Sequence, residues 1–231
     1  MSVRPRVGVV VFPGSNDDRD ALWALGALGA EAVPVWHAET TLPDVGAVLL
    51  PGGFSYGDYL RAGALARFAP ALTAVADFAA DGGPVLGICN GFQVLCEAGL
   101  LPGVLRPNTS LTFVCRDVEV RVERDDTPFT TRCHAGQTLR IPIKHGEGRW
   151  FADEALLRDV ADLDQVVLRY VGENPNGSVD RVAGVVNSEG NVMGLMPHPE
   201  HAVDPLLGSG DGALILASLV AAAHERLFVT T

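Results

Sequence analysis

The chain has 231 residues, 48% of them hydrophobic, and a net charge of −11 at pH 7. This length and apolar content suffice for one sizeable core, so we expect a single domain over residues 1–231. Lys144 is the only lysine, which leaves no basic stripe for nucleic acid and no P-loop lysine for a nucleotide phosphate. The apolar run at 213–223 is far shorter than a membrane span.

The four cysteines show neither a Cys-x-x-Cys pair nor another spacing typical of zinc ligands. Free thiols in a reducing compartment are therefore favoured over disulfides, and the cytoplasm is the expected location. We expect no metal site in this chain.

Strand-like and helical patterns alternate along the first hundred residues, which predicts βαβ units and an open, doubly wound, mainly parallel sheet with helices on both faces. The expected strands lie at 6–12, 31–36, 46–50 and 84–88, and the expected helices at 17–29, 62–81 and 90–100. From about 111 to 197 the sequence becomes strand-rich, with a short helix near 153–161. A long helix is expected at about 211–227.

A glycine pair follows the strand predicted at 46–50, in the segment Pro51-Gly52-Gly53. Glycine lets a backbone approach a ligand closely and turn an N–H group inward. We predict that the backbone amides of Gly53 and of Asn90, which lies just past the end of the strand predicted at 84–88, form an oxyanion hole. One such donor is commonly worth about a hundredfold in rate. A tight turn between strand and helix is the alternative, and it is compatible with this role.

A cysteine stands at the next strand end, where Cys89 lies between Gly87 and Gly91. The pattern predicts a sharp strand-to-helix turn that places the sulfur beside a helix N-terminus, which favours a thiolate. Cys89 is therefore the candidate nucleophile. A buried cysteine that only packs after a glycine turn remains the alternative.

The third motif lies near the other end of the chain, where prolines flank His198 and Glu200 follows two residues later. Proline fixes the local backbone and removes competing amide donors. Glu200 is close enough in sequence to orient one imidazole nitrogen while the other serves Cys89, which would complete a Cys/His/Glu triad. Taken alone, the motif is also compatible with a turn that carries a solvated histidine.

These three motifs resemble, in content and order, the signatures of class I, triad-type glutamine amidotransferases. Within that superfamily the chain is most similar to the glutaminase subunits of phosphoribosylformylglycinamidine synthases. The resemblance covers almost the whole chain. Its further blocks lie at residues 12–16, 51–61, 108–118, 127–130, 144–148, 174–178 and 208–212.

The resemblance implies a flavodoxin-like fold and further roles for individual residues. The residues that match the family's glutamine-binding positions are Gln93, Asn108, Ser110 and Leu111. His145 matches a position at the pocket rim or the partner interface.

Two positions depart from the family pattern. Asp17 stands where cysteine is frequent, and His201 stands where arginine is frequent. Neither is a triad position, although the second change bears on how the histidine loop meets its neighbours.

The implied activity is hydrolysis of glutamine to glutamate and ammonia through a thioester on Cys89. The implied partners are a large synthetase subunit, which uses the ammonia to convert formylglycinamide ribonucleotide to the amidine in purine biosynthesis, and a small third subunit. ATP and Mg²⁺ are expected on the synthetase subunit, and no cofactor is expected in this chain.

Two other classes of protein stay open at this stage. One is a cysteine hydrolase of the same α/β kind that acts alone on another amide, and it would not react with a glutamine-analogue electrophile. The other is a noncatalytic subunit with a vestigial triad. The presence of Cys89, His198 and Glu200 together argues against it.

Overall fold

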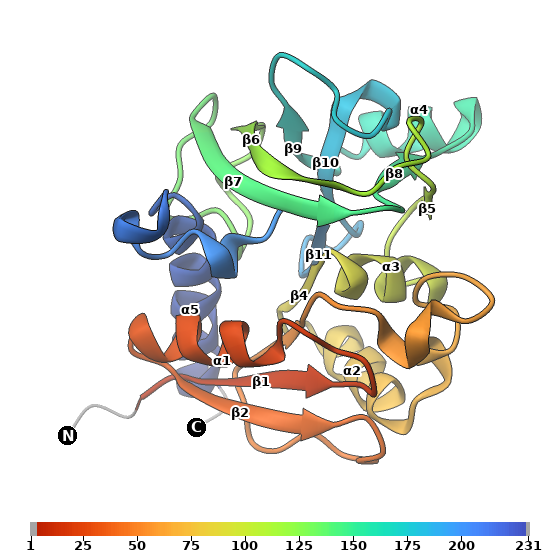
Figure 1. Ribbon diagram of the computed structural model, residues 1–231. Coiled ribbons are helices and arrows are strands. Elements are labelled where there is room, and N and C mark those ends of the chain that lie inside the picture. The colour runs from red at the N-terminus through yellow and green to blue at the C-terminus, as the bar shows by residue number, and fades with distance from the viewer. Residues whose placement is uncertain (1–3, 230–231) are drawn as a thin grey trace.

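The computed structural model describes residues 4–229. Their main sheet has nine strands, and it extends across the molecule (Figure 1). Its strands follow the order β2, β1, β3, β4, β11, β10, β9, β6, β7. The first five are parallel neighbours: β2 (Glu31–Trp36), β1 (Arg6–Val11), β3 (Ala47–Leu50), β4 (Val85–Ile88) and β11 (Val192–Leu195).

The sheet continues beyond β11 with four antiparallel strands. They are β10 (Val182–Val186), β9 (Val166–Tyr170), β6 (Val114–Val122) and β7 (Thr138–His145). This is the strand-rich section expected at 111–197. A separate two-stranded ribbon pairs β5 (Val104–Arg106) with β8 (Arg149–Phe151).

Helices cover both faces of the parallel half. Helix α1 (Asp18–Ala27) and helix α5 (Gly212–Val229) pack against each other and against β1, whereas α3 (Asn90–Glu97) packs against β3, β4 and β11. Helix α2 (Pro70–Ala80) follows β3, and α4 (Glu154–Asp162) lies beside the antiparallel half. The α/β fold expected from the sequence is confirmed.

Local sequence explains most of these elements. Strands β3 and β4 are buried at every residue, as expected for parallel strands covered on both faces. Helix α1 carries Asp18 and Asp20 in its first turn, where they complement the helix dipole. Helix α4 begins after Asp153, whose carboxylate accepts a 2.9 Å hydrogen bond from Leu156 N.

The helix predicted at 62–81 is wrong over its first eight residues, because the α-helix begins only at Pro70. Ala69 is extended, as the residue before a proline tends to be, and Gly63 has a positive φ of 79°. Only a short 3₁₀ turn, Ala66–Phe68, interrupts the irregular stretch. The alanine-rich composition hid this boundary.

Within residues 4–229, none of the helices combines the length and the apolar character needed to cross a bilayer.

Candidate active site

Cys89 lies on a sharp turn between β4 and α3, with φ 51° and ψ −101°, which is a rare conformation for a residue with a side chain. The flanking glycines make the turn possible. A Cβ on Gly91 would collide with the carbonyl oxygen of Leu50 in β3, and one on Gly87 would lie 2.7 Å from Gly91 C. The N–H of Cys89 donates to Leu195 O at 2.8 Å, so a hydrogen bond to β11 fixes the backbone of Cys89.

His198 lies on the loop after β11 and its side chain is almost completely buried. Its Nδ1 lies 2.6 Å from Glu200 Oε1, and its backbone N–H donates to Pro142 O in β7 at 2.8 Å. Among residues 4–229 its Nε2 has no hydrogen-bond partner. The carboxylate therefore orients the ring and leaves Nε2 for chemistry.

The electrostatic surroundings of His198 favour its protonated form. Burial alone disfavours the imidazolium, but the negative charges of Glu200 and Cys89 outweigh burial and raise the pKa of His198 to about 10. The site thus favours the imidazolium form of His198.

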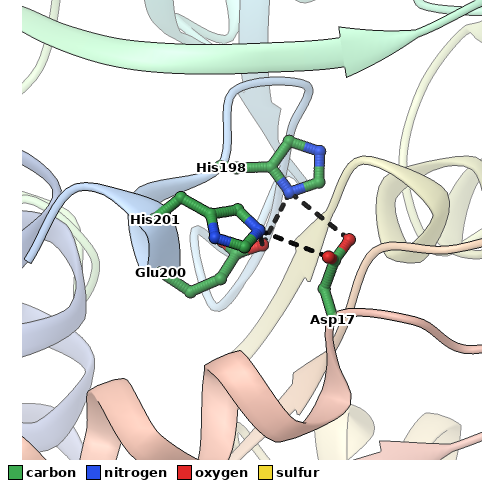
Figure 2. Close-up of side chains that lie close together, drawn as sticks. All are labelled: Asp17, His198, Glu200 and His201. Atoms are coloured by element: carbon green, nitrogen blue, oxygen red, sulfur yellow. Dashed lines mark hydrogen bonds and ion pairs between the residues drawn. The ribbon is translucent and has the colours of Figure 1, made fainter. Parts of the chain in front are cut away.

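A second carboxylate lies beside this histidine (Figure 2). Asp17 stands at the N-cap position of α1, yet its side chain does not cap the helix. Its Oδ2 lies 3.6 Å from His198 Nδ1, and its Oδ1 pairs with Lys144 Nζ and, at 3.2 Å, with His201 Nε2. Burial raises the pKa of Asp17, but His201, His198 and Lys144 together hold that pKa well below its usual range.

The glycine pair after β3 brings the backbone close to these groups. A Cβ on Gly52 would collide with Asp17 Oδ2 and would lie 2.7 Å from His198 Cε1. Gly53 has φ 139°, a conformation that glycine adopts readily, and it lines the same cavity as Cys89. Asn90 is the first residue of α3, where a backbone N–H has no partner within the helix.

The side chains of Asn90 and Gln93 connect α3 to the loops around the cavity. Asn90 Oδ1 accepts from Ser55 N at 3.2 Å, and Asn90 Nδ2 donates to Gln93 Oε1 at 2.9 Å. Gln93 Nε2 in turn donates to Glu147 O at 2.6 Å. The polar groups of Gln93 are thus already paired within the protein.

The other three residues predicted to bind glutamine do not line the cavity. Asn108 is fully buried and its side chain holds the turn after β7. Its Nδ2 donates to His145 O at 2.9 Å, and its Oδ1 accepts from Gly148 N at 3.0 Å. Ser110 and Leu111 are exposed.

Cys89, His198, Gly53 and Gln93 line one cavity of about 290 Å³. The remaining lining residues come from four loops and from strand β7: Asn16, Asp17, Phe54, Asp58, Phe113, Lys144, His145, Gly146 and Glu147. A larger hollow of about 530 Å³ lies beside α2, but no cysteine, histidine or lysine lines it. We therefore assign the chemistry to the smaller cavity.

Two titratable groups in the cavity wall are shifted toward their neutral forms. Burial, then the charge of Glu147, raises the pKa of Asp58 to about 6, against the effect of a hydrogen bond from Asn90. Burial, followed by the charge of His198, lowers the pKa of His145 to about 4. Both shifts show that the cavity wall disfavours a charge on these two side chains.

The sequence singled out Asp17 and Lys144 without assigning them to the cavity, and it gave Phe113 no site role. Lys144 carried one signal, because it is the only lysine of an acidic chain. Asp17 departs from the family pattern, as does its partner His201, but nothing in the sequence joined two residues that lie 184 positions apart.

Comparisons with known proteins agree with these features. The family model of the CobB/CobQ-like glutamine amidotransferase domain matches residues 4–210. A phosphoribosylformylglycinamidine synthase subunit PurQ of Rubrobacter xylanophilus is 61% identical over 218 residues, which cover 94% of this chain and 99% of the relative.

Solved structures give a similar picture. The structure of PurLQS from Thermotoga maritima contains a chain with 47% identity and a TM-score of 0.87, and the match covers 95% of this chain and 99% of that one. The glutaminase domain of Trypanosoma brucei CTPS with bound acivicin is 16% identical with a TM-score of 0.64, over 96% of this chain and 94% of that one. At that identity the likeness concerns the fold alone.

Proposed function

Because the chain belongs to the CobB/CobQ-like glutamine amidotransferase family, we propose that it hydrolyses glutamine to glutamate and ammonia as the glutaminase subunit of phosphoribosylformylglycinamidine synthase. One observation carries the proposal: a cysteine on a strained turn and a carboxylate-bound histidine share a cavity. The near-full-length similarity to a PurQ subunit identifies the enzyme to which the activity belongs. The proposal assigns the activity to one domain over residues 1–231.

Catalysis begins when Cys89 Sγ, with its proton on His198 Nε2, attacks the side-chain amide carbon of glutamine. Glu200 keeps the ring oriented through Nδ1. The imidazolium then protonates the leaving nitrogen, the carbon–nitrogen bond breaks, and ammonia departs. Water attacks the resulting thioester after giving a proton to His198, and the carbon–sulfur bond breaks to release glutamate.

We assign the oxyanion hole to the backbone N–H groups of Gly53 and Asn90. Two observations support them: Gly53 lines the cavity, and Asn90 directly follows the nucleophile at a helix N-terminus. The N–H of Cys89 is already bonded to Leu195 O, which makes it an unsuitable donor.

For glutamine recognition, Gln93 is the predicted residue that lies at the cavity. We propose that Asn108 acts indirectly, because its hydrogen bonds shape the turn that presents Gly146 and Glu147. Ser110 and Leu111 remain proposed contacts. They require the loop between β5 and β6, which carries them, to close over bound glutamine.

The ammonia is passed to a synthetase subunit, with a small third subunit in the complex, as the composition of PurLQS suggests. Half-exposed Phe54 and Phe113 line the cavity and give its mouth an apolar surface suited to a partner. ATP and Mg²⁺ belong on the synthetase in this proposal. The compartment is the cytoplasm, as favoured by four free cysteines.

The test is glutamate release from glutamine by the wild-type chain and by Cys89→Ala, each with and without the synthetase and small subunits, ATP and formylglycinamide ribonucleotide. We expect activity that depends on Cys89 and yields the amidine in the complete mixture. The assignment is wrong if glutamine turnover never exceeds the Cys89→Ala background while the complex still works with free ammonia. Labelling of Cys89 by a glutamine-analogue electrophile separates this activity from hydrolysis of another amide.

A further inference from the structure

Four side chains with metal-ligating atoms converge behind the reactive face of His198 (Figure 2). They are His198, His201, Asp17 and Glu200, and one ligand atom from each lies within 4.8 Å of the others. Asp17 comes from the start of α1, whereas the other three come from the loop after β11. All but His201 are buried.

The spacing of these atoms is close to that of a tetrahedral site. With metal–ligand bonds of about 2.0–2.1 Å, ligand atoms around Zn²⁺ lie roughly 3.3 Å apart. Asp17 Oδ1 lies 3.2 Å from His201 Nε2, and the other oxygen of that carboxylate, Oδ2, lies 3.6 Å from His198 Nδ1. Glu200 Oε1 is 3.6 Å from His201 Nε2 and 2.6 Å from His198 Nδ1, so this last pair must move apart to hold an ion.

The donor set and its unsatisfied atoms also suit a metal ion. Two imidazole nitrogens and two carboxylates form a mixed nitrogen and oxygen set that binds Zn²⁺ and similar divalent ions. Glu200 Oε2 is buried and has no hydrogen-bond partner among residues 4–229. A buried carboxylate oxygen without a donor is costly, and a cation held by both oxygens of Glu200 would relieve that cost.

Lys144 competes with a metal ion for this place. Its ammonium pairs with Asp17 Oδ1, and its side chain is about a third exposed. An exposed lysine on a flexible stem can turn to solvent when a divalent ion takes the carboxylate. Lys144 thus competes with a metal ion for Asp17 without excluding it.

We propose that His198 Nδ1, His201 Nε2 and the carboxylates of Asp17 and Glu200 form an inhibitory site for a zinc-class divalent ion. The ion takes the place of the proton between His198 Nδ1 and Glu200, and that proton passes to solvent. A metal on Nδ1 separates His198 from its orienting carboxylate and opposes a positive charge on the ring. The inhibitory effect rests on the proposed glutaminase activity, whereas the binding site does not.

Binding is measured by titrating Zn²⁺ calorimetrically into a Cys89→Ala/Cys115→Ser background, which removes the two thiols most able to capture zinc. We expect about one equivalent bound, at least tenfold weaker binding after His201→Ala, and unchanged binding after the matched exposed change His134→Ala. Lys144→Gln should bind zinc more tightly, because the competing cation is gone. Absence of binding in the background, equal affinity after His201→Ala, or weaker binding after Lys144→Gln would each overturn the site.

Inhibition is measured separately as glutamate release by the chain with unaltered cysteines, in complex with its partners, with Zn²⁺ and then with a chelator. We expect reversible inhibition that is at least tenfold less sensitive in His201→Ala, each variant being compared with its own zinc-free rate. Stoichiometric binding without inhibition would refute the inhibitory role. Loss of turnover in every zinc-free sample would instead refute the proposed function and leave the calorimetric result to decide the site.

Discussion

The two halves of the nine-stranded sheet hold the candidate active site by different means. In the parallel half, Cys89 and Gly53 are fixed by backbone geometry, through glycine contacts and positive φ angles at strand ends. In the antiparallel half, the turn after β7 is held by side-chain hydrogen bonds from Asn108 and Gln93. The reacting sulfur therefore lies on the half fixed by backbone geometry, and one wall of the cavity lies on the half held by side-chain hydrogen bonds.

His198 joins the two halves. It follows β11, the last parallel strand, and its N–H donates to Pro142 O in β7. The comparison therefore predicts large, all-or-none effects for changes in the parallel half and graded effects for changes in the antiparallel half.

The largest effect is expected for Gly91→Ala, because the new Cβ would collide with the backbone of β3 at Leu50. We expect the free energy of unfolding to fall by more than about 4 kcal/mol, since neither backbone segment can move aside cheaply. Urea unfolding measures it. The matched control is Gly26→Ala in α1, where no atom lies within 4 Å and a stabilisation of up to about 1 kcal/mol is expected. Similar stabilities for the two variants would contradict a backbone-fixed elbow.

The next largest effect is expected for Glu200→Gln, which tests the orientation of His198, the residue that joins the two halves. It replaces the carboxylate at His198 Nδ1 by a neutral amide, so we expect kcat for glutamine hydrolysis to fall roughly 10³-fold with a smaller change in KM. The control is Glu154→Gln, an exposed change in the first turn of α4. A Glu200→Gln enzyme with normal kcat would remove Glu200 from the triad.

A graded effect is expected for Asn108→Ala. The change leaves His145 O and the Gly148 N–H without their partner, and we expect a loss of about 3 kcal/mol in the free energy of unfolding. Ser110→Ala, in the same predicted glutamine-binding segment but exposed, should change it by less than about 0.5 kcal/mol. Reduced glutamine affinity in Asn108→Ala at unchanged stability would instead make Asn108 a direct ligand.

The smallest effect is a pH dependence at His145. Burial lowers its pKa in the folded chain to about 4, so the unfolded chain binds more protons between about pH 6.5 and 4. His145 therefore supports the fold above pH 6.5, and this support is lost as the pH falls toward 4. His145→Asn should reduce the loss of stability between pH 7 and 5 by about 1–2 kcal/mol, measured by urea unfolding at each pH. His134→Asn, an exposed change, should leave it as in the wild type.

Sequence reasoning reached the parallel half because its signals are local. Buried apolar runs, glycines beside Cys89 and prolines beside His198 each act within a few residues, and they predicted the strands and the cavity-facing groups. The start of α2 was missed because alanine-rich composition favours a helix that Pro70 and Gly63 delay.

The Asp17 cluster and the supporting role of Asn108 depend on contacts between distant segments. Asp17 meets His201 across 184 residues, and Asn108 meets His145 across 37. No local periodicity reports such pairs. The expectation of no metal site stays a prediction, and spacing along the chain does not report ligands that only the fold assembles.

The paired amide of Gln93 has a consequence for the proposed recognition of glutamine. Its oxygen accepts from Asn90 and its nitrogen donates to Glu147 O, so a ligand that engages this side chain exchanges one hydrogen bond for another. Such an exchange adds little to net affinity. A non-cognate ligand that displaces Asn90 or Glu147 O from Gln93 without replacing the hydrogen bond leaves a buried polar group unpaired, at a cost of about 1–3 kcal/mol. We therefore expect Gln93 to contribute more to discrimination among amino acids than to affinity for the accepted one.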